Sequence, residues 1–134
     1  MNIFECWEIK IIDFKPDSED GAGYAIVADI AGPRNFTETI RVSFRDDFIE
    51  TYFKVHWYQS LAEEEDKLEK AKRDLFIRWT LVRIERWIKE GQPGNALLIT
   101  AEKDMAWAHD IEKGILRPAS KPVGEYSFRY DPRK

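Results

Sequence analysis

Alternation of apolar and polar side chains predicts three strands in the N-terminal third. In the clearest run, Phe36–Arg45, one parity is apolar apart from Glu38 and the other is polar. This pattern is typical of a strand with one face on a core and one face in water. Two earlier runs are Ile3–Phe14 and Tyr24–Ala31, and the polar segment Lys15–Gly23 separates them. A Gly-Pro turn separates the second run from Phe36–Arg45. Because short connections favour antiparallel neighbours, we expect a three-strand meander.

The first of these runs carries apolar residues on both parities. Ile9 and Ile11 fall on one side, whereas Ile12 and Phe14 fall on the other. The pattern indicates either partial burial on both faces or a β-bulge near Lys10 that moves the later residues to the opposite face.

A long helical signal occupies the middle of the chain. Asp47–Glu50 has the form of a capping box, and a second box occurs at Ser60–Glu63. Two start signals favour a short helix, a kink over His56–Gln59 and a new long helix over Leu61–Glu90. One continuous helix is the alternative. The Gly-Gln-Pro-Gly segment Gly91–Gly94 is expected to end the long helix.

The second half of this helix is apolar on two sides. On a wheel at about 100° per residue, two apolar stripes are separated by polar positions. The first stripe contains Leu68, Ala71, Leu75, Trp79 and Val82, and the second stripe contains Ile77, Leu81, Ile84 and Ile88. A polar stripe holds Arg78, Glu85 and Lys89, with the last two spaced for an ion pair. If the first stripe packs on the sheet, the second needs either the C-terminal segment of the same chain or a second subunit.

The C-terminal third predicts a strand, a short helix and a strand. Asn95–Thr100 is a short apolar run that we expect to be buried. Glu102–Lys113 can form a helix with Met105, Ala108 and Ile111 inward, and Val123–Tyr130 alternates as a strand does. The predicted fold class is therefore α+β, with an antiparallel meander of three N-terminal strands packed on one long helix. The C-terminal strand–short helix–strand element completes a single domain over residues 1–134.

Composition restricts the partners more than the chemistry. The 134 residues carry a net charge of −4, which gives no general attraction to nucleic acid or anionic membranes. The single cysteine, Cys6, cannot form an internal disulfide and is interpreted as a small buried apolar residue. No run approaches the roughly 18 apolar residues of a membrane span, and the N-terminus lacks a leader pattern. We therefore expect a soluble, cytoplasmic protein without membrane contact.

Catalytic and metal-binding patterns are weak. The histidines His56 and His109 lack zinc-ligand spacing, and a cluster of His109 and Glu112 with Asp104 is interpreted as ordinary surface. The serines lack the strained Gly-x-Ser-x-Gly context of a hydrolase nucleophile. We predict no catalytic residue, no cofactor and no metal, and a non-enzymatic role is favoured over an enzymatic one.

The leading hypothesis is a small non-enzymatic protein-interaction module that acts as an adaptor, inhibitor or subunit. Its partner is another protein or a second copy, with homodimerisation through the long helix as one form. The candidate contact residues are Trp57 and Tyr58 at the proposed kink, and Ile84 and Ile88 on the second stripe.

Two alternatives come from other classes. A nucleic-acid-binding accessory protein could use a face of arginine and tryptophan side chains, where rings stack on bases. The basic residues of that face are Arg78, Arg83, Arg86 and Lys89. The other alternative is a small ligand-binding protein or enzyme with a pocket between sheet and helix, lined by Tyr, Trp and either an acid or His56.

Overall fold

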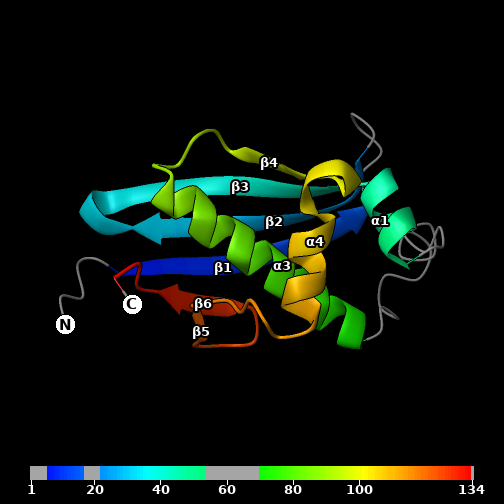
Figure 1. Cartoon of the computed structure of the whole chain (residues 1–134). Coiled ribbons are helices and arrows are strands. Elements are labelled where there is room, and N and C mark those ends of the chain that lie inside the picture. Colours follow the sequence, from blue (N-terminus) through cyan, green and yellow to red (C-terminus); the bar gives the residue numbers. More distant parts are fainter. Residues whose placement is uncertain (1–5, 17–21, 54–69, 134) are drawn as a thin grey trace.

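A mixed six-stranded sheet carries helices on one face (Figure 1). The computed structural model describes residues 6–16, 22–53 and 70–133. The strands are β1 (Trp7–Pro16), β2 (Ala22–Gly32), β3 (Phe36–Arg45), β4 (Ala96–Ile99), β5 (Lys121–Pro122) and β6 (Ser127–Tyr130). The helices are α1 (Asp46–Phe53), α3 (Lys70–Lys89) and α4 (Ala101–Glu112), and a short turn, η3 (Pro33–Asn35), joins β2 to β3. The predicted α+β class is confirmed.

The strand order is β4-β3-β2-β1-β6-β5. The strands β1, β2 and β3 form the predicted antiparallel meander, and β6 and β5 extend it antiparallel beyond β1. The strand β4 pairs with β3 in parallel. The chain between them contains α1 and α3, so this pair is a crossover and not a hairpin.

A β-bulge in β1 explains the two apolar parities of the first run. Ile11 pairs with Ala28 and Asp13 pairs with Val27, so Ile12 is the extra residue. Phe14 then lies opposite Ile26 and packs against the same core as Ile11, while the Ile12 side chain is 48% exposed. The bulge alternative is confirmed, at Ile12 rather than at Lys10.

The start of α1 and the end of α3 lie close to the positions that the capping box and the Gly-Gln-Pro-Gly segment predicted. The helix α1 begins at Asp46, directly after β3, and α3 ends at Lys89. Gly91 and Gln92 follow with φ of 88° and 58°, a conformation that stops a helix. The proposed kink lies outside the described residues, and so do Trp57 and Tyr58.

The core between sheet and helices contains a cluster of aromatic rings. Phe44 of β3 contacts Phe76 of α3 edge-to-face at 4.8 Å between centroids, and Trp79 lies 5.0 Å from Phe76. The Trp79 indole donates its N–H to the Ala108 carbonyl of α4 at 3.1 Å. Since a buried indole N–H requires an acceptor, this bond also fixes α4 across α3.

The second apolar stripe of α3 is covered within the same chain. Ile77, Leu81, Ile84 and Ile88 are at most 8% exposed and belong to the same core as the sheet. The intrachain alternative therefore accounts for this stripe. No second subunit is needed to cover Ile84 and Ile88.

Glu85 does not face water, and its predicted ion pair with Lys89 is wrong. The Glu85 carboxylate is buried and accepts three hydrogen bonds from the segment after α4. The donors are the Ala119 N–H at 3.0 Å, the Ser120 N–H at 2.9 Å and the Ser120 hydroxyl at 2.6 Å. Lys89 remains exposed.

The C-terminal elements differ from expectation at their edges. The strand β4 is buried on one face only, because Leu98 on its other face is 43% exposed. The last strand begins at Ser127 and not at Val123, and the short strand β5 (Lys121–Pro122) was not predicted. On α4, Ala108 and Ile111 are buried as predicted, whereas Met105 is only partly buried. None of the described helices combines the length and apolar character of a membrane span.

Candidate functional site

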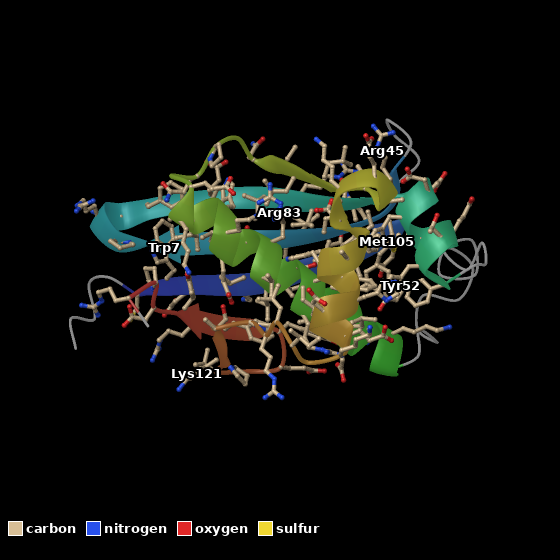
Figure 2. The ribbon with its side chains drawn as sticks, in the orientation of Figure 1. Trp7, Arg45, Tyr52, Arg83, Met105 and Lys121 are labelled. Carbon is tan, nitrogen blue, oxygen red and sulfur yellow. The ribbon has the colours of Figure 1, made fainter. Side chains whose placement is uncertain are left out.

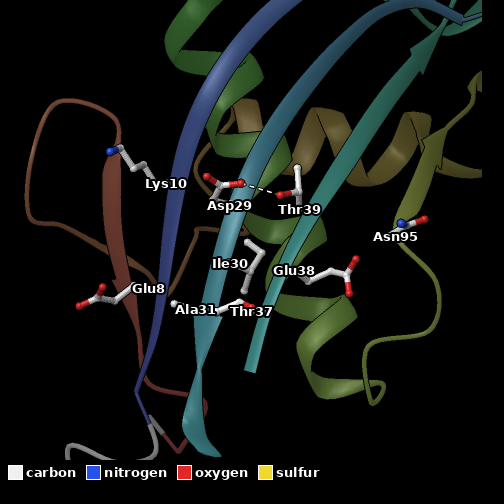
Figure 3. Close-up of a pocket in the computed structure, with 9 residues that line it drawn as sticks. All are labelled: Glu8, Lys10, Asp29, Ile30, Ala31, Thr37, Glu38, Thr39 and Asn95. Atoms are coloured by element: carbon white, nitrogen blue, oxygen red, sulfur yellow. Dashed lines mark hydrogen bonds between the residues drawn. The ribbon is translucent and has the colours of Figure 1, made fainter. Parts of the chain in front are cut away.

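One face of the sheet carries none of the described helices. The buried side chains of α1, α3 and α4 belong to the same core as Ile26 and Phe44 of the sheet. On the opposite face, a depression of about 720 Å³ lies near the turn between β2 and β3 (Figure 3). Its lining comes from β1, β2, β3 and the residue before β4: Glu8, Lys10, Asp29, Ile30, Ala31, Thr37, Glu38, Thr39 and Asn95.

Strand register places the polar lining of this depression. Lys10, Asp29 and Thr39 lie in one row across β1, β2 and β3. The Thr39 hydroxyl donates to the Asp29 carboxylate at 2.7 Å (Figure 3). One row further, Glu8 lies 3.8 Å from the Arg129 guanidinium of β6. The row of side chains is thus held by cross-strand contacts, as expected on a solvent-facing sheet.

The strands β3 and β4 differ in length, and this leaves part of β3 unpaired. The strand β3 has ten residues, whereas β4 has four and pairs with Arg41–Phe44. Among the described residues, no strand pairs with Phe36–Ile40 on the side away from β2. We call this segment, Phe36–Ile40, the free edge of β3.

The backbone direction along the free edge follows from one hydrogen bond. The Arg41 N–H donates to the Asn95 carbonyl at 3.0 Å, so the backbone groups of Arg41 point toward the β4 side. Backbone groups of alternate residues in a strand point the same way. The N–H and C=O groups of Thr37 and Thr39 therefore face the free edge.

The free edge is only partly protected against strand pairing. Exposed edges are commonly blunted by Lys, Pro, a bulge or very short length. The opposite edge of the sheet has such features, because β5 consists of Lys121 and Pro122 alone. The free edge contains one charged residue, Glu38, and no Lys or Pro, and its two threonines favour extended backbone.

A second polar cluster joins α1 to α4. The ring of Tyr52 on α1 (Figure 2) stacks on His109 of α4 at 4.5 Å, and the Tyr52 hydroxyl donates to Glu112. Burial, and then the hydrogen bond to Glu112, raise the pKa of Tyr52 above its ordinary value. The His109 Nδ1 atom lies 3.8 Å from the Glu112 carboxylate.

Asp104 is separated from this cluster. It is buried and accepts a hydrogen bond from the Thr100 N–H at 2.9 Å, at the start of α4. Among the described residues, no three His, Cys, Asp or Glu side chains are grouped as metal ligands. The Tyr52 cluster is a contact between α1 and α4.

The four basic residues of the nucleic-acid alternative have different environments. Arg78 donates to the Ile111 carbonyl at 3.0 Å, and Arg86 lies 3.5 Å from Glu90. Burial, and then the charge of Arg86, lower the pKa of Arg83, while Lys89 is exposed. The rings of Trp79 and Trp87 are fully buried, so they offer no stacking surface for bases.

Sequence reasoning placed Thr37 and Thr39 on the polar face of their strand but missed the free edge. The one signal for the free edge was that the run Asn95–Thr100 is shorter than the run Phe36–Arg45. This signal could not be used, because the sequence did not show that the two runs pair. No family model matches this chain, and no curated protein or solved structure matches it significantly.

Proposed function

We propose that this protein is a protein-interaction module that binds an extended segment of a partner as an added strand along the free edge of β3. The observation that carries the proposal is the difference between the ten residues of β3 and the four of β4. In strand addition, main-chain hydrogen bonds give affinity and alternate side chains give specificity. The free edge has room for a partner strand of about five residues.

The surroundings of the free edge support the same proposal. The depression is lined by Thr37, Glu38 and Thr39 of this edge and by Asn95 beyond it. The backbone groups of Thr37 and Thr39 would pair with the incoming strand, which would extend the line of β4. Side chains of that strand would contact those of Thr37 and Thr39, its direct neighbours on the open face of the sheet.

A proline substitution separates backbone pairing from side-chain contact. Thr39→Pro removes the N–H that faces the free edge. It does not remove any N–H donor of the hydrogen bonds between β3 and β2. Thr39→Ala is the matched control, since it also loses the hydroxyl bond to Asp29 but keeps the N–H. Peptides selected from a displayed library against the wild type provide the probe.

We expect selected peptides to bind the wild type and Thr39→Ala with similar Kd, and Thr39→Pro about tenfold or more weakly. Hydrogen exchange at the Thr37 and Thr39 amides should slow when peptide is bound. Circular dichroism checks that each variant is folded. Equal binding to Thr39→Pro, or slowed exchange elsewhere, would show that strand addition is wrong.

A second copy of the chain is one partner that the same variants test. If the free edge pairs with its counterpart, light scattering of the wild type gives a mass that rises with concentration, and Thr39→Pro stays monomeric. This dimer would be joined by β3 and not by the long helix.

A further inference from the structure

A second concave site lies between α3 and the C-terminal segment. Its volume is about 420 Å³, and it shares no lining residue with the depression beside β3. The apolar part of its lining includes Ile77 and Leu81 of α3 and Phe128 of β6, which are 8%, 3% and 8% exposed. These three side chains are buried, so the cavity reaches the edge of the core and exposes only a small part of it to a ligand.

Two arginines at this cavity are each anchored by one N–H to the C-terminal end of α4. The Arg78 Nη1 atom donates to the Ile111 carbonyl at 3.0 Å, and the Arg117 Nε atom donates to the Gly114 carbonyl at 3.1 Å. Carbonyl groups at a helix C-terminus attract cations, so this position suits both guanidinium groups. Each guanidinium has five N–H donors, and the anchoring bonds use one of them.

In the described part of the chain, these two charges have no carboxylate within ion-pair distance. Neither Arg78 nor Arg117 forms an ion pair within 4.0 Å there, although both line the cavity. Asp74 and Glu125 line it too, so the four charges cancel. A multiply charged anion would be repelled by the two carboxylates, whereas a single carboxylate matches a guanidinium pair.

We propose that this cavity binds an organic monocarboxylate with a small apolar body. The apolar body lies on Ile77, Leu81 and Phe128, and the carboxylate accepts hydrogen bonds from Arg78 and Arg117. A free carboxylic acid and the C-terminal carboxylate of a peptide that ends in leucine share this chemistry. The site does not depend on strand addition at β3.

Isocaproate is a suitable probe, with isocaproamide as its uncharged counterpart. In NMR titrations of the full chain, we expect isocaproate to shift the amide signals of Ile77, Leu81 and Phe128. Isocaproamide should bind about tenfold more weakly, because it lacks the charge that guanidinium groups recognise. N-acetylglycyl-leucine distinguishes the two sources: tighter binding than isocaproate identifies a peptide C-terminus, and weaker binding a free acid.

Arg117→Gln is the decisive variant, because Arg117 is exposed and its replacement leaves the core intact. We expect it to weaken isocaproate binding about tenfold and to leave isocaproamide unchanged. Arg129→Gln, on β6 beside Glu8, removes an arginine outside the cavity and should change neither. Equal affinity for acid and amide, no signal change at the cavity, or inorganic phosphate competing as well as isocaproate would overturn the proposal.

Discussion

Glu85 connects two parts of the molecule through one side chain. Its buried carboxylate receives donors from Ala119 and Ser120, which are 34 and 35 residues further along the chain. Burial of a carboxylate is unfavourable unless strong hydrogen bonds replace its hydration. Here they do, and they hold the segment that places Arg117 and Pro118 at the second cavity. A helical wheel of α3 placed Glu85 on a polar face, because it contains no information on hydrogen-bond donors so far along the chain.

Tyr52 gives a pH-dependent contribution to stability. Its pKa is raised in the folded state by burial and by Glu112. A raised pKa means that the contribution is fully present below about pH 10, the unfolded value, and is lost as the pH rises above it. We expect urea unfolding to show a free energy that falls as the pH rises above about 10, with a smaller fall in Tyr52→Phe.

Tyr130 provides the comparison for this measurement. Its pKa is also raised, first by burial and then by the charge of Glu85. The double variant Tyr52→Phe with Tyr130→Phe should therefore show a smaller alkaline fall than either single variant. If the wild type and Tyr52→Phe lose stability equally over this range, Tyr52 makes no such contribution.

At the scale of elements, the sequence pattern predicted the bounds of strands and helices but not which strands pair. The bounds of β3 matched the alternation of Phe36–Arg45, because one face is buried and the other is polar. The partner of β4 was not predictable, since four mostly apolar residues fit several sheet positions. The free edge follows from that pairing, and the second cavity from bringing Ile77, Arg117 and Phe128 together. Both sites therefore required the structure.

The bulge at Ile12 leads to a prediction about deletions. Removing Ile12 takes out the extra residue, so Asp13 still pairs with Val27 and Phe14 stays on the core face. We expect the deletion variant to fold, with a free energy of unfolding within about 1 kcal/mol of the wild type. Urea unfolding and near-UV circular dichroism measure this.

Deletion of Val27 is the matched control. It lies in β2, which pairs on both sides, so its loss shifts two registers and turns core residues toward water. We expect this variant to lose cooperative unfolding. Equal damage from the two deletions would mean that the bulge itself is needed for the fold.

At the scale of the whole molecule, the chain covers the apolar stripes of its own long helix. Ile84 lies in the core that joins α3 to the sheet, whereas Ile115 after α4 is 73% exposed. Burial within one chain removes the reason for expecting a dimer through the helix. Contacts between copies, where they occur, have to use other surfaces.

Replacing Ile84 tests this view. Ile84→Ala should lower the free energy of unfolding by about 2–5 kcal/mol, because it leaves a cavity in a packed core. Ile115→Ala should change it by no more than about 0.5 kcal/mol. Light scattering should give the same molar mass for both variants and the wild type. A folded Ile84→Ala variant with half the wild-type mass would instead place Ile84 at a subunit contact.

The parallel pair of β3 and β4 has a consequence for the order of folding. The meander of β1, β2 and β3 needs only short loops to close. Arg41 can pair with Ala96 only after α1 and α3 have been placed. Closing a long loop has a larger entropic cost and slows the contact that requires it. During synthesis, the edge of β3 that faces away from β2 therefore stays open to other chains along its whole length until β4 has emerged. Chaperone demand and aggregation of nascent chains should be highest in that interval.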